Sequence, residues 1–155
     1  MMTPFEDLIH ELGAALGMPL HIDHHGACTL QMNEKIRIQI EPDTKEDKIA
    51  MAAYITELSP GKFREEVLKE ALKANASTVA GGSMNNILGF CARHNEFACH
   101  AYLPLRELNT EKLLPVLVSL AEYSISWLEA IQSGRHAPPG VLTKPTSPTP
   151  FGLRP

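Results

Sequence analysis

The side chains best suited to chemistry gather between residues 21 and 28. His21, Asp23, His24, His25 and Cys28 place imidazole, carboxylate and thiol groups within eight residues, and zinc and copper accept such ligands. A strong zinc motif, however, pairs two short ligand groups across a loop. The second group is missing here unless a later cysteine or histidine folds nearby. We therefore predict a solvated turn and keep metal binding as an alternative.

A thiol nucleophile is the other chemistry that the residue types allow. Cys91 would need His94 or His100 as a base that holds it as a thiolate. Cys91 and Cys99 both fall in predicted strands, without a glycine-rich turn or helix start that would stabilise an oxyanion. The double glycine at 81–82 lacks the further glycines and the Lys-Ser/Thr step of a phosphate loop. We predict no catalytic residue, no metal, no cofactor and hence no enzyme.

Composition limits the class of protein further. The chain has 155 residues, 44% hydrophobic and 21% charged, which suits one ordinary domain. The formal charge of -4 and the absence of a Lys/Arg cluster argue against nucleic acid binding. Apolar runs fall short of the roughly 20 residues that span a bilayer, and acidic residues follow the first methionines where a secretory signal is basic. Three cysteines at irregular spacing suit reduced thiols in the cytosol.

The first predicted element is a helix from Thr3 to about Gly17. Its apolar residues recur at three- and four-residue intervals, which indicates one buried stripe. Thr3 and Glu6 have the spacing of a capping box, and Pro4 suits the first helical position. Gly17 provides the stop.

Three strands are predicted next. Residues 28–32 and 36–40 alternate apolar and polar side chains, as half-buried strands do, and Asn33-Glu34 forms a tight turn between them. Residues 48–58 are alanine-rich, which favours helix, but their neighbours favour a third strand.

The second half of the chain predicts a helix, a hairpin and a helix. Ser59-Pro60 opens a helix that ends near residue 75, strands at 87–93 and 97–103 form the hairpin, and an amphipathic helix runs from 109 to Gly134. The proline-rich, weakly charged segment 135–155 is predicted to be disordered. The expected organisation is therefore one α+β domain over 1–134 and a tail over 135–155.

This order of elements resembles the Tir chaperone (CesT-like) family, the class I chaperones of bacterial type III secretion, over roughly residues 5–131. The most specific parts are the end of the first helix at 12–17, the strand 35–40 and the second helix 63–75. The segment 97–113 is similar to that family's last strand leading into its last helix. These motifs are patterns of hydrophobic residues and contain no catalytic signature.

The resemblance implies an α+β homodimer with a helix, a three-stranded antiparallel sheet, a helix, a strand pair and a C-terminal helix. It implies a chaperone of the bacterial cytoplasm that binds the N-terminal segment of one or more effectors in extended form. Without ATP, such a chaperone keeps the segment soluble and secretion-competent and aids its delivery to the secretion apparatus. The expected partners are effectors and a second copy of the chain, with the secretion ATPase as a further candidate. Neither nucleic acid nor membrane insertion is expected.

The resemblance also implies two surfaces, a groove for the effector and a dimer interface. Main-chain hydrogen bonds would give the groove its affinity and apolar pockets its selectivity. The predicted groove residues lie on the first helix and the neighbouring strands: Phe5, Leu8, Leu12, Leu16, Leu30, Met32, Ile36 and Ile38. The predicted dimer residues lie on the second helix: Phe63, Val67, Leu68 and Leu72, of which we place Val67 and Leu72 nearer the partner.

Three alternatives stay open. Each of these apolar side chains would serve equally well to fill the core of its own domain, because one face of every amphipathic helix does so. The same fold would also suit a regulatory or adaptor protein that binds a folded partner. A metal-binding protein that uses the 21–28 cluster is the third alternative.

Overall fold

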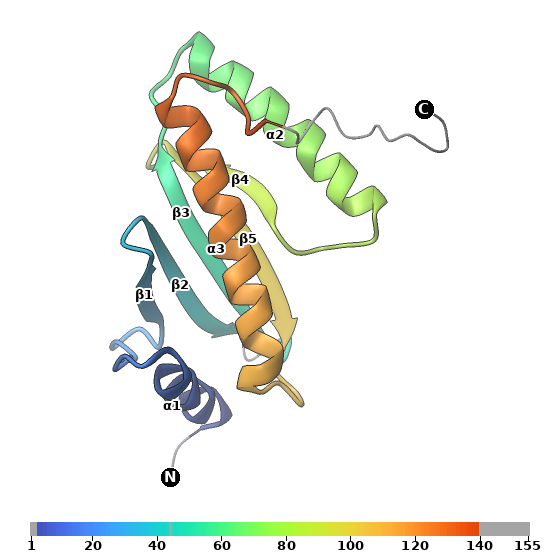
Figure 1. The fold of residues 1–155 in the computed structure, drawn as a ribbon. Coiled ribbons are helices and arrows are strands. Elements are labelled where there is room, and N and C mark those ends of the chain that lie inside the picture. Colours follow the sequence, from blue (N-terminus) through green and yellow to red (C-terminus); the bar gives the residue numbers. More distant parts are fainter. Residues whose placement is uncertain (1–2, 44, 140–155) are drawn as a thin grey trace.

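The chain folds into a single antiparallel sheet with helices against one of its faces (Figure 1). This computed structural model describes residues 3–43 and 45–139. The elements in chain order are α1 (Pro4–Leu16), β1 (Cys28–Met32), β2 (Ile36–Asp43), β3 (Lys48–Glu57), α2 (Lys62–Ala80), β4 (Ile87–Cys91), β5 (Glu96–Pro104) and α3 (Thr110–Gln132). The strand order is β1-β2-β3-β5-β4. The predicted three-stranded sheet and strand pair are therefore parts of one sheet, joined by β3 and β5.

The ends of α1 confirm the signals at the start of the sequence. The Thr3 hydroxyl accepts a hydrogen bond from the Glu6 backbone N–H at 3.1 Å, and the Glu6 carboxylate accepts one from the Thr3 N–H at 2.7 Å. This reciprocal pair satisfies two amide groups that a helix start leaves without partners. Gly17 ends the helix with φ +70°, a backbone conformation that glycine adopts without strain.

The strands follow the predicted two-residue alternation. Ile36, Ile38 and Ile40 are fully buried and face α3, while Arg37 and Glu41 point to the opposite side. The ambiguous segment is the strand β3, as predicted, and the turn between β1 and β2 has positive φ at both Asn33 and Glu34. The sheet thus has an inner, apolar face and an outer face whose residues are half-buried or exposed, apart from the buried Ala98.

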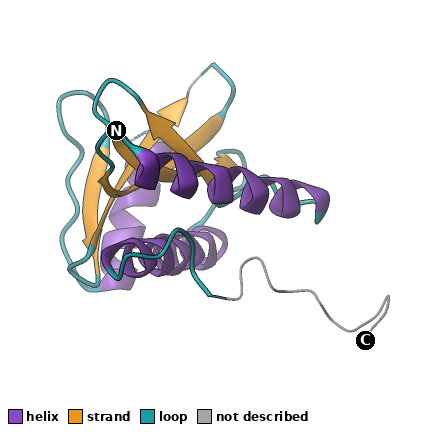
Figure 2. Ribbon diagram, turned by 90° about the horizontal axis from the view of Figure 1, so that it is seen from above, coloured by secondary structure: helices purple, strands orange, loops and turns teal. Residues whose placement is uncertain are grey.

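α3 packs across the inner face and closes the core. Trp127 and Phe97 of β5 are fully buried, with ring centroids 5.6 Å apart in an edge-to-face arrangement, a geometry that aromatic rings favour. By length and composition α3 would suit a membrane span, but burial against the sheet and α1 accounts for its apolar side chains. Figure 2 shows α3 on one side of the sheet and no helix on the other.

α2 lies beside the edge strand β4. The Asn75 side chain donates a hydrogen bond to the Leu88 carbonyl and accepts one from the Leu88 N–H, both at 2.8 Å. The amide thus takes the place of a neighbouring strand at this point. The helix continues to Ala80, beyond the predicted end near Asn75. The Thr78 hydroxyl bonds the Ala74 carbonyl, and the backbone N–H of Gly81 bonds the Ser77 carbonyl.

The chain after α3 turns back toward α2. The His136 ring lies 5.3 Å from the Phe63 ring, and Ala137 packs against the core. His136 and Ala137 of the predicted tail are thus in contact with the domain, and residues 140–155 lie outside the described residues.

Replacement of Asn75 by alanine tests the closure of the β4 edge. The Leu88 N–H and carbonyl would lose their partner, so we expect Asn75→Ala to lower the free energy of unfolding by about 1–3 kcal/mol in urea denaturation. Ser77→Ala on the same helix is the control, since Ser77 is exposed, and its effect should stay within about 0.5 kcal/mol. Equal effects of the two substitutions would contradict this role of Asn75.

Candidate partner-binding surfaces

The open edge of the sheet is β1, which has only β2 as a neighbouring strand. The chain before β1 covers its start, where Ile22 bridges Cys28 and the Asp23 N–H donates to the Ala27 carbonyl at 2.8 Å. Backbone groups of alternate residues point to the same side of a strand, so Gln31 faces the open edge, past this bridge. An exposed edge is where an extended peptide adds a further strand.

An apolar hollow of about 400 Å³ lies at the end of α1. The hollow is lined by Ile9, His10, Gly13, Ala14, Gly17, Met18, Pro19 and Leu20. Gly13 permits the chain to fold back here, because a Cβ on it would stand 2.9 Å from the Met18 carbonyl oxygen. The segment that forms the hollow leads directly to the bridge at β1, so hollow and edge are neighbours. The sequence analysis did not predict this hollow. The signal in the sequence is Met18, an apolar residue between the helix-ending Gly17 and Pro19, where the chain has to turn.

The structure separates the predicted groove residues into two groups. Six of the side chains, Phe5, Leu8, Leu12, Leu30, Ile36 and Ile38, are at most 5% exposed and belong to the core of this protomer. Leu16 and Met32 are partly exposed. Contact of any of these eight side chains with an effector stays a prediction. In the described protomer only Leu16 and Met32 of the eight are exposed enough to make such a contact.

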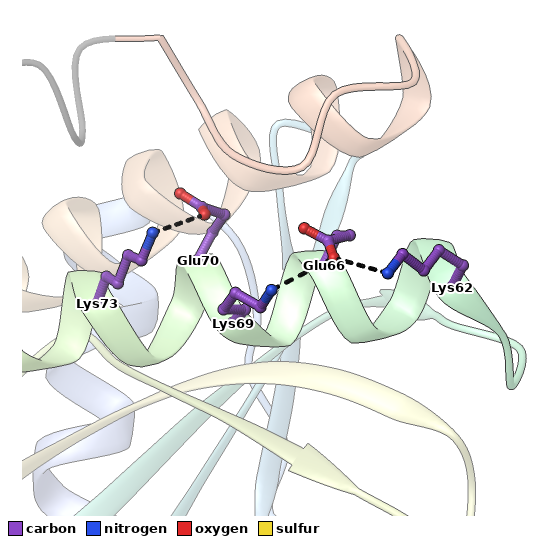
Figure 3. Close-up of polar contacts among 5 residues, drawn as sticks. All are labelled: Lys62, Glu66, Lys69, Glu70 and Lys73. Carbon is purple, nitrogen blue, oxygen red and sulfur yellow. Dashed lines mark hydrogen bonds and ion pairs between the residues drawn. The ribbon is translucent and has the colours of Figure 1, made fainter.

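α2 has three distinct faces around its axis. Val67, Ala71 and Ala74 are buried against the domain. Five charged residues form ion pairs along a second face: Lys62–Glu66, Lys69–Glu66 and Lys73–Glu70, at 3.3–3.4 Å (Figure 3). Leu68, Leu72 and Val79 share a third face at helical spacing, and the side chains of Leu72 and Val79 are 69% and 49% exposed. We name this third face the α2 stripe.

The predicted dimer residues fall on different faces of α2. Val67 is fully buried within the protomer, whereas Leu72 is the most exposed large apolar side chain of the described residues. Phe63 is 37% exposed and contacts His136, and Leu68 is partly buried. Of the two residues placed nearest the partner, Leu72 is thus accessible and Val67 is not.

The 21–28 cluster is a hydrogen-bonded turn. One carboxylate oxygen of Asp23 accepts from the His25 and Ala27 N–H groups at 2.8 and 3.0 Å, and these bonds lower the pKa of Asp23. Across residues 3–43 and 45–139, no three His, Cys, Asp or Glu side chains are placed to hold a metal ion together. The carboxylate therefore has a structural task in this turn.

The second candidate cluster does come together on the outer face of the sheet. Cys91, His94 and His100 line the same hollow of about 880 Å³. Within the described chain, however, no side-chain hydrogen bond joins the thiol to either imidazole, and a backbone bond of 3.2 Å from His94 to Cys91 closes the turn. The arrangement lacks the base contact that activates a nucleophile.

Thiol reactivity should distinguish the three cysteines. Cys91 is exposed while Cys28 and Cys99 are buried, and burial raises the pKa of Cys28 and raises that of Cys99 to about 12. We expect a thiol reagent such as DTNB to modify one cysteine rapidly in the native protein and all three after denaturation. Cys91→Ser should remove the rapid phase. A rapid phase that survives this substitution would show that a buried thiol is accessible.

The pH dependence of stability should report on His100. Burial lowers its pKa from the ordinary value of 6.5, so below about pH 6.5 the unfolded chain binds a proton that the folded chain resists. The contribution of neutral His100 to the free energy of unfolding is therefore fully present above this pH and is lost as the pH falls toward the lowered pKa of the folded state. We expect urea unfolding free energies to decrease from about pH 7.5 to about pH 5.5, and less steeply in His100→Gln. The exposed His94→Gln should keep the wild-type slope, and an unchanged slope in His100→Gln would contradict the assignment.

Comparison with known proteins identifies the class of this fold. The chain resembles a chain in the HopA1–SchA chaperone–effector complex, with a TM-score of 0.69 and 16% identity over 82% of this chain and 94% of the other. It also resembles a chain in the ExoT–SpcS complex from Pseudomonas aeruginosa, with a TM-score of 0.58 and 20% identity over 81% of this chain and 97% of the other. A third similar structure is that of the Yersinia pestis type III secretion chaperone SycH with a fragment of YscM2. Its TM-score is 0.55 and its identity 13%, over 77% of this chain and 95% of the other. The fold is therefore that of type III secretion chaperones.

Residues 7–128 match the model of the Tir chaperone protein (CesT) family. The chain belongs to this family, as the sequence patterns indicated. A search of curated proteins gave no match.

Proposed function

We propose that this protein is a type III secretion chaperone that holds the N-terminal segment of one or more secreted effectors in extended form. The family match over residues 7–128 carries the proposal, and two of the similar solved structures are of chaperones with bound partners. The chaperone would act in the bacterial cytoplasm, without ATP and without catalysing a reaction. It would keep the segment secretion-competent and pass it to the secretion apparatus, where the ATPase is the proposed contact.

The open edge of β1 and the hollow beside α1 support a specific binding mode. Backbone groups at Gln31 would pair with the effector segment, and side chains of that segment would enter the hollow near Met18 and Leu20. Strand addition reads the main chain and pockets read alternate side chains. Leu16 and Met32 are the predicted groove residues that this mode would use.

Purification from the native bacterium tests the function. The tagged chain should co-purify with a secreted protein, and mass spectrometry should locate the protected segment near the N-terminus of that protein. Light scattering should give a complex with two copies of the chain. A captured partner that is folded throughout and not exported would favour the adaptor alternative instead.

Substitution of Gln31 tests strand addition with the captured effector segment. Gln31→Pro removes the backbone N–H that faces the open edge, and an edge position tolerates proline. We expect the dissociation constant to rise about five- to tenfold for the lost hydrogen bond, measured by calorimetry. Gln31→Ala keeps the N–H and is the matched control. If both variants bind as the wild type does, the segment does not pair with β1.

A second copy of the chain is the proposed partner of the α2 stripe. Leu72 and Val79 expose large apolar side chains that a monomer would leave in water. We expect Leu72→Asp to raise the dimer dissociation constant at least about tenfold, as removal of a central contact does, in sedimentation experiments. Val118→Asp on α3 is the control, since Val118 is 36% exposed and lies off the stripe. Equal weakening by both substitutions would place the interface elsewhere.

A further inference from the structure

We propose that the outer face of the sheet is a docking trough for a helical segment of the client, about 15 residues long, with basic side chains at both ends. This inference rests on the proposed function and adds the chemistry of a second client segment. It concerns a surface that neither the β1 edge nor the α2 stripe includes.

The trough consists of two hollows that meet in the middle of the sheet. One, of about 880 Å³, lies toward the β4–β5 turn, and the other, of about 270 Å³, lies toward Glu41 and Tyr102. Tyr54 and His100 line both hollows. No described helix covers this face (Figure 2), so the trough runs uncovered along β3 and β5.

Small residues form the floor of the trough. Ala50 and Ala52 of β3 pair with Tyr102 and His100 of β5, and Ala98 pairs with Tyr54. Gly89 adds to the floor, where a Cβ would stand 3.4 Å from the His100 ring. Alanine and glycine are poor strand formers and add little polarity to an open face. These small residues would let a helix approach the sheet closely, because their side chains are short.

The charges around the trough indicate what the occupant carries. The described residues that line the two hollows include three carboxylates, Glu41, Glu57 and Glu96, and one fixed cation, Arg37. Arg37 is engaged by Glu96 at 3.6 Å and lies 4.5 Å from the centre of the Tyr54 ring. Within the described residues Glu41 and Glu57 form no ion pair, and burial lowers the pKa of His100. At the Glu41 end, Lys48 lies 4.8 Å from the centre of the Tyr102 ring and is engaged by Glu46 at 2.7 Å. The trough is thus uncharged in its middle near neutral pH, and its two ends carry the carboxylates of Glu41 and Glu57.

The spacing of these acids fits a helix of moderate length. Glu41 lies beside Ala50, seven residues from Glu57 along β3, which corresponds to about 23 Å at 3.3 Å per residue. A helix rises 1.5 Å per residue, so about 15 residues would place basic side chains near both carboxylates. Small and apolar residues between them would face the alanine floor.

Synthetic peptides test the trough without any secreted protein. We would label an alanine- and leucine-based peptide of about 15 residues with two lysines at each end, and a matched peptide with glutamates in those places. Fluorescence anisotropy with the full chain should show tighter binding of the lysine peptide. The double variant Glu41→Gln/Glu57→Gln should weaken it roughly two- to tenfold, and Ala52→Lys should abolish it. Glu34→Gln/Glu111→Gln removes the same charge from exposed positions elsewhere and should leave binding unchanged.

Three results would overturn the proposal. Equal binding of the two peptides would remove the charge argument, and an unchanged affinity in the double variant and in Ala52→Lys would place binding outside the trough. Loss of dimer by Ala52→Lys in light scattering, with its melting temperature intact, would show that a second copy occupies this face. None of these results bears on effector capture, so the proposed function would still depend on its own test.

Discussion

The packing of α3 against one face of the sheet is the interaction on which the other features depend. Trp127, Leu117, Leu120 and Leu113 are fully buried because the inner residues of β2, β3 and β5 present isoleucines, methionine and Phe97 to the helix. A large share of the hydrophobic stabilisation therefore lies on one side of the sheet. The outer face carries less of this burial and is available for a different use.

The two edges of the sheet differ in how their backbone groups are covered. At β4, Asn75 satisfies the backbone of Leu88 and α2 lies alongside, so no strand can be added at that point. At β1, the preceding chain covers only the start of the strand, where Ile22 bridges Cys28. An extended segment that seeks backbone partners thus meets one accessible edge, next to the apolar hollow at the end of α1.

Local patterns predicted the elements well, because each depends on spacing alone. The alternation of Ile36, Ile38 and Ile40 requires a strand with one buried face, and the capping box at Thr3 places the start of α1. Spacing could not separate core from exposed surface, since Val67 and Leu72 are both apolar positions of one helix and only the position of β4 decides which is covered. The outer trough was not predicted, because a single alanine in a strand does not indicate which face it lies on or what it adjoins. Only the strand register brings Ala50, Ala52 and Ala98 together.

The open surfaces differ in the groups that they would offer a client, and this has a consequence for affinity. A strand edge as short as that of β1 offers few hydrogen bonds, each worth about 1 kcal/mol net, and ordering an extended segment costs roughly as much per residue. The edge alone would therefore hold a client weakly and without selectivity. Apolar hollows add both, but each contributes little by itself. Two copies of the chain joined through the α2 stripe would double the number of sites on one client, and the second site then binds at a high effective concentration. On this argument dimerisation is part of how such a chaperone holds its client, in addition to any effect on the stability of the protomer.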